Sequence, residues 1–539
     1  MNLHFIPLNK YDNVIEHFDG SITIPPFEKK RYLFTCQQNQ DIYLLNNSDG
    51  CLYSYSIVKN TILQINNDNT SILQNKIGIA CHSNLFVSFD PNNLMFNWYN
   101  NIHFEIEHTI KVDFEVNNFT VYDNVIWACN RKTLTLYKIS LTNFKIDNIE
   151  YFTYKGIGNT SLLINNNELF ITDSEENTIR CYNLNGKFQY EALTPFIDPI
   201  GQVYYNQQHF VLYGGLVNEV GYENRCWQEQ KPFFHAIKLR IETEKNLKIV
   251  YSNAFEVDFF YEEHLYDKIA EEHLPLTIRL ALPSETYHQK IVEISPLGLP
   301  FELITENNQT YAQYTISQPH VKAIGYKATI QLQSVKFNAI NSIDLCLKNE
   351  CLLTENEKNE LNIENPYFDQ FINDEKTDLE KVKKARNQLY SKLQYKKNIY
   401  AKSFEDVLKD GYGTCGDYTS LLLICFTKNN IACQSVGGYK IPRFYISQSG
   451  IMSIYYNHAW IEVFDKENSF VLPIESSSDD KEFENRFSEG QFLGIDWTHI
   501  KLYNGKANPK LAHIPSHPQI HPFDVLKKAE VFVILRQEL

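Results

Sequence analysis

One cysteine, one histidine and one glutamate stand in local sequences that suit nucleophilic catalysis. Cys415 lies in the segment G-Y-G-T-C-G-D-Y, in which Thr414 can cap a helix that begins at or near the cysteine. A thiol at a helix N-terminus faces unpaired backbone N–H groups and the positive end of the helix dipole, which favour the thiolate. His458 follows in Y-Y-N-H-A-W, and Glu475 in V-L-P-I-E-S-S. This order predicts a nucleophile, a base and a residue that orients the base.

Two helices are predicted ahead of the cysteine by their capping residues. Thr377 and Glu380 form a T-x-x-E capping box before a run with helical spacing. Ser403 with Asp406 marks a second, shorter helix, which we expect to end near Gly411.

The segments that carry the other two residues alternate apolar and polar side chains, as strands do. The run 421–426 is apolar throughout and predicts a buried helix body after the cysteine. A strand at 431–436 is followed by strands at 455–464 and 469–478, which carry His458 and Glu475 respectively. The expected site is therefore one helix N-terminus facing two strands.

With these motifs in place, the last part of the chain resembles the transglutaminase-like cysteine enzymes, which have a papain-like α+β core. Y-G-T-C matches the family's Y-G-x-C, H-A-W matches its H-x-W, and V-L-P-I-E-S-S aligns with its segment ending in D-x-T. The G-D-Y after the cysteine is frequent in bacterial members. The resemblance covers residues 346–539 and implies Cys415 as nucleophile, His458 as base and Glu475 as third member.

Two residues depart from the family's pattern. Glu475 stands where most members have aspartate, and it is one methylene longer. Asp479 is the alternative acid. Val471 occupies a position where tryptophan is common in the family.

Two aromatic residues near these motifs are candidate substrate contacts. Trp460 is two residues from His458 and so shares the same face of the strand, where it either lines the site or packs in the core. Tyr412 lies in the turn just before Cys415. No residue pattern indicates a cofactor.

The first 232 residues contain a repeat. Five apolar strands recur at spacings of 40 to 44 residues, most with polar turn residues just before them, and they are centred on Tyr43, Phe86, Ile126, Phe170 and Val211. A period near 42 with several strands per unit is typical of a β-propeller blade, and this length allows five to six blades. The clearest unit, 162–187, resembles blades of NHL- and WD40-like propellers. Two stacked sheets without closure are the alternative.

Residues 233–345 predict an immunoglobulin-like β-sandwich. Alternating runs are separated by Gly, Pro and Asn, and they cover 235–241, 247–251, 276–282, 291–294, 311–316 and 323–335. The stretch 280–294 resembles part of the β-domain that precedes many bacterial transglutaminase-like catalytic domains. The chain is thus expected to be multidomain, with an all-β propeller at 1–232, the sandwich at 233–345 and an α+β papain-like catalytic domain at 346–539.

Charge and cysteine content exclude several classes of protein. A net charge of −15 argues against nonspecific binding to nucleic acid or an anionic membrane. The 11 cysteines include no C-x-x-C pair, which argues against a zinc ribbon or a thioredoxin-type motif. We expect mostly reduced, buried thiols, and the odd number leaves room for one functional cysteine. With no secretory signal and no apolar run of membrane-spanning length, we expect a cytoplasmic protein. Prolines interrupt the cluster of His499, His513, His517 and His521, so no metal site is expected there.

The function expected from these residues is thiol-dependent acyl transfer from an amide of a protein or peptide substrate. The thioester would react with an amine or with water, giving cross-linking or amidase and peptidase chemistry. The alternative is a non-catalytic interaction protein that uses the propeller and keeps a vestigial triad. The sequence predicts no oligomeric state.

Overall fold

The computed structural model describes residues 21–23, 33–38, 40–56, 59, 61–151, 160–214, 232–266, 273–306, 309–340, 345, 353, 355–396, 403–441, 451–454, 457–465, 470–477, 490–505 and 511–539. Internal contacts divide the chain into two compact units, one spanning Ile15–Arg240 and the other including Ile241–Leu539. Within the described ranges, no helix combines the length and apolar character that crossing a bilayer requires.

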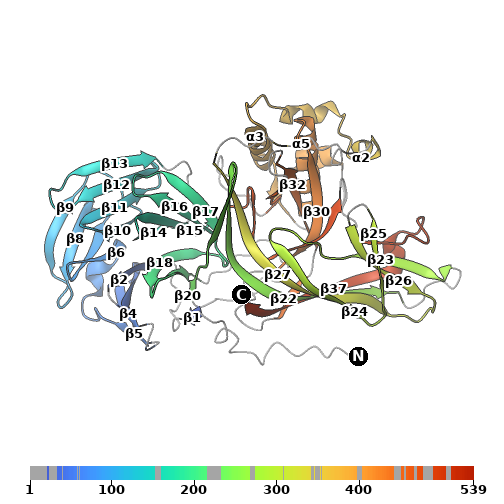
Figure 1. Cartoon of the computed structure of the whole chain (residues 1–539). Helices are drawn as coiled ribbons and strands as arrows, with labels where there is room; N and C mark the ends of the chain where they lie inside the picture. The colour runs from blue at the N-terminus through green and yellow to red at the C-terminus, as the bar shows by residue number, and fades with distance from the viewer. Residues whose placement is uncertain are drawn as a thin grey trace. The chain divides into compact units, whose positions relative to one another are not determined.

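In the unit Ile15–Arg240, the described residues form five antiparallel sheets of four strands each. Figure 1 shows these sheets. A short helix, α1 (Thr70–Leu73), follows the first sheet. The strands of the successive sheets are β2 (Leu33–Gln38), β3 (Asp41–Asn46), β4 (Cys51–Ser56) and β5 (Thr61–Gln64); β6 (Ile77–His82), β7 (Leu85–Asp90), β8 (Met95–Asn100) and β9 (Ile106–Lys111); β10 (Asn118–Tyr122), β11 (Val125–Asn130), β12 (Thr135–Ser140) and β13 (Ile146–Tyr151); β14 (Thr160–Asn165), β15 (Glu168–Asp173), β16 (Thr178–Asn183) and β17 (Phe188–Leu193); and β18 (Pro199–Tyr205), β19 (Gln208–Tyr213), β20 (Phe233–Ala236) and β1 (Ser21–Thr23).

The five apolar runs of the sequence repeat are confirmed as strands, and each is the second strand of its sheet: β3, β7, β11, β15 and β19. The polar residues before four of these strands form the tight turns of hairpins. Their backbone has positive φ at Asn84 (66°), Asn124 (56°), Asn167 (63°) and Gln207 (63°). Asparagine tolerates this left-handed conformation better than most residues, which explains why it precedes the strands so often.

The first strands of these sheets contact one another in a closed order. β2 contacts β6, β6 contacts β10, β10 contacts β14, β14 contacts β18, and β18 contacts β2 again. Between β2 and β18, the Thr35 hydroxyl donates to the Gln202 carbonyl and accepts from the Gln202 N–H, both at 3.0 Å. The Gln202 side chain also donates to the Ser161 carbonyl on β14 at 2.7 Å. Hydrogen bonds therefore join the last sheet to both the first and the fourth.

The last of these sheets contains strands from both ends of the unit. β1 pairs with β20, and Phe234 of β20 lies opposite Leu212 of β19. The prediction that residues 235–241 form the first strand of the sandwich is therefore wrong in part, because the beginning of this run belongs to β20. Pairing between segments this far apart in the chain leaves no local sequence signal.

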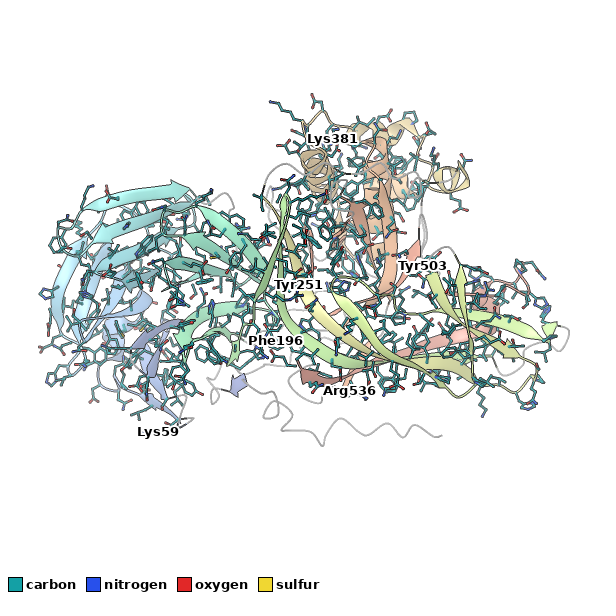
Figure 2. All side chains as sticks on the ribbon, viewed as in Figure 1. Lys59, Phe196, Tyr251, Lys381, Tyr503 and Arg536 are labelled. Carbon is teal, nitrogen blue, oxygen red and sulfur yellow. The ribbon has the colours of Figure 1, made fainter. Side chains whose placement is uncertain are left out.

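The unit that includes Ile241–Leu539 contains a sheet of seven strands, with the main order β24-β27-β22-β37-β31. β22 pairs with β27 on one side and with β37, at the end of the chain, on the other. Arg536 on β37, which is labelled in Figure 2, forms an ion pair with Asp258 on β22 at 2.8 Å. The strands are β21 (Arg240–Glu244), β22 (Leu247–Leu265), β24 (Gln289–Leu297), β27 (Ala323–Ala339), β31 (Ile451–Ile454), β34 (Gly494–Ile495) and β37 (Leu526–Glu538).

A second sheet in this unit has the order β25-β26-β23-β36. Its strands are β23 (Leu276–Ala281), β25 (Glu302–Glu306), β26 (Gln309–Ile316) and β36 (Ala512–His513). The other alternating runs predicted between 247 and 335 are confirmed as parts of β22, β23, β24, β26 and β27. Their arrangement as an immunoglobulin-like sandwich remains a prediction.

The three motifs lie on a four-stranded sheet and on the helix packed against it. The sheet has the order β33-β32-β30-β35, and α5 contacts β32, β30 and α3 (Figure 1). Leu421 to Phe426 of α5 are fully buried in the surrounding core, as expected. The elements are α2 (Glu355–Glu360), η5 (Pro366–Phe371), α3 (Asp378–Tyr390), β28 (Gln394–Tyr395), α4 (Phe404–Asp410), β29 (Tyr412–Gly413), α5 (Cys415–Lys428), β30 (Cys433–Lys440), β32 (Asn457–Phe464), β33 (Val471–Ile474), β35 (His499–Gly505) and α6 (Pro522–Val525).

The predicted helix starts are confirmed by their caps. Thr377 and Glu380 form a capping box at the start of α3. Ser403 accepts a hydrogen bond from the Asp406 N–H at the start of α4, and Gly411 ends that helix with φ of 73°. Only glycine adopts this conformation at little cost, so a local signal fixes where the chain turns toward α5.

Candidate active site

Cys415 is the first residue of α5, as the cap at Thr414 predicts. The Thr414 hydroxyl accepts a hydrogen bond from the Asp417 N–H at 3.4 Å, and the Asp417 carboxylate accepts one from the Thr414 N–H at 2.8 Å. This capping box holds the first turn of the helix, and the thiol at its start is half-buried. Cys415 is therefore at the positive end of a helix whose body is anchored in the core.

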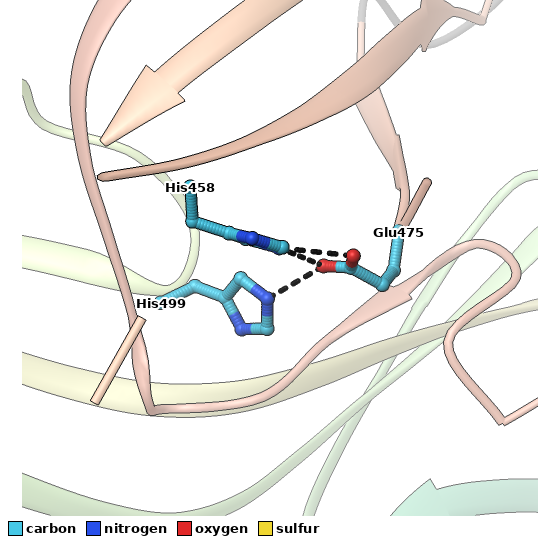
Figure 3. A group of neighbouring side chains, drawn as sticks. All are labelled: His458, Glu475 and His499. Atoms are coloured by element: carbon cyan, nitrogen blue, oxygen red, sulfur yellow. Dashed lines mark hydrogen bonds and ion pairs between the residues drawn. The ribbon is translucent and has the colours of Figure 1, made fainter. Parts of the chain in front are cut away.

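His458 and Glu475 come from neighbouring antiparallel strands of the sheet against which α5 packs. His458 is the second residue of β32, and Glu475 directly follows β33. The His458 Nε2 atom lies 2.9 Å from both carboxylate oxygens of Glu475 (Figure 3). The Cys415 thiol and the His458 ring lie close enough for His458 to lower the pKa of the thiol. Since Nε2 is engaged by Glu475, Nδ1 is the nitrogen that remains for the sulfur.

The structure thus brings the three predicted residues together, and their electrostatics favour an ion pair between Cys415 and His458. Burial raises the pKa of the Cys415 thiol, but the hydrogen bond and charge of His458, with the Ala459 N–H, outweigh it and hold the pKa below its ordinary value. Burial lowers the pKa of His458, but the Glu475 charge and the bond to Cys415 raise it to about 9. At neutral pH these shifts favour thiolate and imidazolium.

Glu475 itself is fully ionised in this setting. Burial raises the pKa of its carboxyl, yet the charges of His458 and Lys440 and the bonds from His458 and His499 hold that pKa well below its ordinary value. The Ser477 N–H also donates to the carboxylate at 3.1 Å. Several donors to one carboxylate stabilise its charged form without water.

A second set of hydrogen bonds fixes the backbone around the site. The Thr419 hydroxyl on α5 donates to the Ser476 hydroxyl at 2.8 Å, which donates to the Ala459 carbonyl on β32 at 2.7 Å. The Tyr390 hydroxyl on α3 bonds the carbonyls of Glu475 at 3.0 Å and Ser476 at 2.8 Å. The helix with the nucleophile, the strand with the base and the segment with the acid are therefore tied directly together.

A second histidine, which the sequence did not assign to the site, also bonds Glu475. The His499 Nε2 atom on β35 lies 2.7 Å from Glu475 Oε2, and its Nδ1 atom lies 3.1 Å from Asp496 Oδ1 (Figure 3). Both His499 and Asp496 are fully buried. The D-x-x-H spacing is the local signal that could have pointed to this pair, because the acid three residues earlier can reach the ring.

The two candidate substrate contacts lie in different environments. Trp460 is fully buried beside Val436 and Ile495, and its ring lies 6.1 Å from the His458 ring and 5.3 Å from the His499 ring. Within the described structure, its Nε1–H has no hydrogen-bond partner. Tyr412, in contrast, is 41% exposed. Tyr412 is therefore accessible just before the nucleophile, and substrate contact by either residue remains a prediction.

The remaining candidates of the sequence do not join this group. His513 packs on the Tyr311 ring at 4.9 Å and His517 on the His273 ring at 5.6 Å, so the four C-terminal histidines form no common cluster. Cys425 and Cys433 are buried, as expected for core thiols. The alternative acid Asp479 lies outside the described residues, as do Cys226, Cys346 and Cys351.

A metal ion is the other species that these side chains can hold. The ligand atoms of His458, Glu475 and His499 all lie within 4.8 Å of one another. Two imidazoles and a carboxylate are a donor set that zinc uses. However, both Nε2 atoms are already bonded to Glu475 oxygens, so an ion would have to replace these hydrogen bonds.

Replacing Thr414 by alanine tests whether the cap positions the nucleophile. The change leaves the Asp417 N–H without its acceptor, and loss of such a cap costs about 1 kcal/mol. We expect the calorimetric transition of this unit to fall by about 2 °C, with slower alkylation of Cys415. Thr414→Ser keeps the hydroxyl and should match the wild type; equal losses in both variants would contradict the role of the cap.

Comparisons with known proteins agree with the geometry. The family model described as the Transglutaminase-like superfamily matches residues 366–472. No match was found among curated proteins.

Several solved structures show partial similarity to this chain. A candidate cysteine protease from Cytophaga hutchinsonii is 13% identical, with a TM-score of 0.35, covering 53% of this chain and 100% of that one. Myxococcus xanthus glutaminyl cyclase is 10% identical, with a TM-score of 0.27, covering 41% of this chain and 91% of that one. Staphylococcus aureus virginiamycin B lyase is 12% identical, with a TM-score of 0.24, covering 38% of this chain and 64% of that one. From the family match, residues 366–472 are a domain of the transglutaminase-like superfamily, whose members are typically cysteine-dependent enzymes.

Proposed function

We propose that this protein is a thiol-dependent acyl-transfer enzyme that attacks amide bonds of a protein or peptide substrate. The observation that carries the proposal is the placement of Cys415 beside His458, whose Nε2 atom is bonded to the Glu475 carboxylate. In this assignment Cys415 is the nucleophile, His458 the proton carrier and Glu475 the residue that orients the imidazole. The amide is a glutamine side chain or a peptide bond.

The reaction follows from the ion pair. The Cys415 thiolate attacks the amide carbonyl carbon and forms a tetrahedral intermediate. His458 gives its proton to the leaving amine, the carbon–nitrogen bond breaks, and a thioester with Cys415 remains. His458, now neutral, takes a proton from an incoming amine or water, which attacks the thioester and releases the sulfur as thiolate.

The start of α5 supplies donors for the oxyanion of the intermediate. The capping box uses the Asp417 N–H, and the N–H groups of Cys415 and Gly416 point the same way at the helix start. Helix N-terminal N–H groups stabilise negative charge that develops beside them. The two outcomes of the reaction, cross-linking and hydrolysis, differ only in whether an amine or water reaches the thioester.

For the unit Ile15–Arg240 we infer a five-bladed β-propeller that binds the substrate. The closed order of contacts among β2, β6, β10, β14 and β18 supports this arrangement, as does the completion of the last sheet by β1. Propellers present loops on a rigid ring, which suits recognition of a protein or peptide.

Incubation with a glutamine-containing peptide and a tagged primary amine tests the proposal. Tag incorporation would establish cross-linking, release of ammonia without the tag would establish amidase activity, and new peptide termini would establish proteolysis. Each product should disappear in Cys415→Ala. If the wild type yields none of the three from any donor peptide, or if Cys415→Ala retains the activity, the proposal is wrong and a binding function becomes the better reading.

A further inference from the structure

The carboxylate of Glu475 is shared between two histidines, of which the proposed reaction uses only one. His458 bonds both of its oxygens, and His499, on the edge strand β35, bonds Oε2 at 2.7 Å (Figure 3). His499 and Glu475 are both buried, at 0% and 2% exposure. The second bond is therefore removed from water and from any substrate.

Two carboxyl groups hold the His499 ring from both sides. Its Nδ1 faces Asp496, and its Nε2 faces Glu475. The ring therefore has a carboxyl oxygen within hydrogen-bond distance of each nitrogen. The Asp496 carboxyl oxygens accept hydrogen bonds from the Thr498 N–H at 2.9 Å and from the Gln491 side-chain amide at 2.6 Å.

The result is a continuous row of neighbouring side chains through the site: Asp496, His499, Glu475, His458 and Cys415. Within it the Glu475 carboxylate has a hydrogen-bond partner on each side, which offsets the cost of removing its charge from water.

Other ionisable side chains of the described residues also face this row. Lys440, at the end of β30, acts on Glu475, and Lys501 on β35 is bound by Glu462 on β32 at 2.7 Å. His288 packs against the His499 carbonyl, and burial lowers the pKa of its ring to about 3, so it is neutral.

We propose that His499, oriented by Asp496, is a positioning residue that fixes the Glu475 carboxylate as an anion in the orientation His458 needs. The inference rests on the proposed function and extends the triad to five members. It also gives a reason for glutamate at this position, since one carboxylate must reach rings on both β32 and β35. Without the His499 bond, Glu475 would take up a proton at higher pH and release His458, and the thiolate would then be lost.

A pair of isosteric variants separates this role from simple structural support. His499→Asn keeps an N–H donor near the Nδ1 position, toward Asp496, and loses the bond to Glu475. His499→Gln places its amide near the Nε2 position and keeps that bond. The readout is the rate at which iodoacetamide alkylates Cys415 as a function of pH, followed by mass spectrometry in the full chain. His288→Asn is the matched control, because it removes a buried histidine next to the same strand without touching Glu475.

In His499→Asn, we expect the acid limb of the profile, where the alkylation rate of Cys415 falls as the pH is lowered, to lie about one pH unit higher than in the wild type. In His499→Gln the acid limb should return toward the wild-type pH, and in His288→Asn it should not change. If His499→Asn does not fold, Asp496→Asn carries the test and should move the limb in the same direction. The inference is overturned if the limb moves equally in the Asn and Gln variants, or not at all, or if EDTA alters the wild-type profile, which would make these residues metal ligands. A wild-type Cys415 without any acid limb below pH 8 would instead count against the proposed function.

Discussion

At pH 6, Cys415 is expected to react with iodoacetamide at least about 100-fold faster than it does in a His458→Ala variant. An ordinary cysteine has a pKa near 8.5, so roughly 0.3% of it is thiolate at this pH. The bond to His458 and the imidazolium charge hold the pKa of Cys415 below its ordinary value, and both are lost with the ring. The measurement is the alkylation rate of the peptide that contains residue 415, by mass spectrometry.

The same helix provides an internal control for this experiment. Cys425 lies on α5 as well, but burial raises the pKa of its thiol far above the ordinary value. It should remain unlabelled in folded wild type and variant alike, so labelling there would report unfolding. His513→Ala, remote from the sheet that holds the site, should leave the rate at Cys415 unchanged. A rate at Cys415 that is indifferent to His458 would mean that the thiol is not activated.

The raised pKa of His458 also sets the upper pH limit of the expected activity. The pKa of His458 is raised to about 9, so the imidazolium that protonates the leaving amine persists through neutral pH and is lost above about pH 9. The sign for stability is the same: the raised pKa of His458 stabilises the fold fully below pH 6.5, and this contribution is lost as the pH rises through 9. For Glu475 the sign is opposite, since its lowered pKa stabilises the fold above pH 4.5 and the effect is lost in acid.

The helix starts and the three motif residues could be predicted because their signals are local. Each cap depends on residues within four positions of one another, such as Thr414 with Asp417 and Ser403 with Asp406. The strand periodicity likewise located β32 and β33 without knowledge of their partners. Where a residue's role is set by its immediate neighbours, the sequence contains the information.

The second histidine could not be predicted because its position depends on strand order. β30 lies between β32 and β35 in the sheet, which brings His499 near a glutamate 24 residues earlier. This approach requires Gly438, since a Cβ at this position would lie 1.9 Å from the Ile500 carbonyl oxygen. The glycine is visible in the sequence, but the strand that packs on it is not. The pairing of β37 with β22 is hidden for the same reason.

The glutamate that departs from the family's aspartate is where the second large effect is expected. Glu475→Gln should reduce acyl transfer by roughly 10²- to 10⁴-fold. The amide keeps the size of the side chain but cannot accept from two charged rings, and without the anion the pKa of His458 falls, because burial then dominates. Alkylation of Cys415 at pH 6 should fall together with turnover, since both require the same ion pair.

Two companion variants make this result interpretable. Glu462→Gln removes another buried carboxylate of the same sheet, the partner of Lys501, and should cost stability without changing the pH profile at Cys415. Glu475→Asp keeps the charge but is one methylene shorter, so it can hold one ring better than two. If aspartate supports full activity, the length of Glu475 serves no purpose in catalysis and the second histidine loses its role. If it supports activity only when His499 is also replaced by asparagine, the two positions are coupled as the shared carboxylate requires.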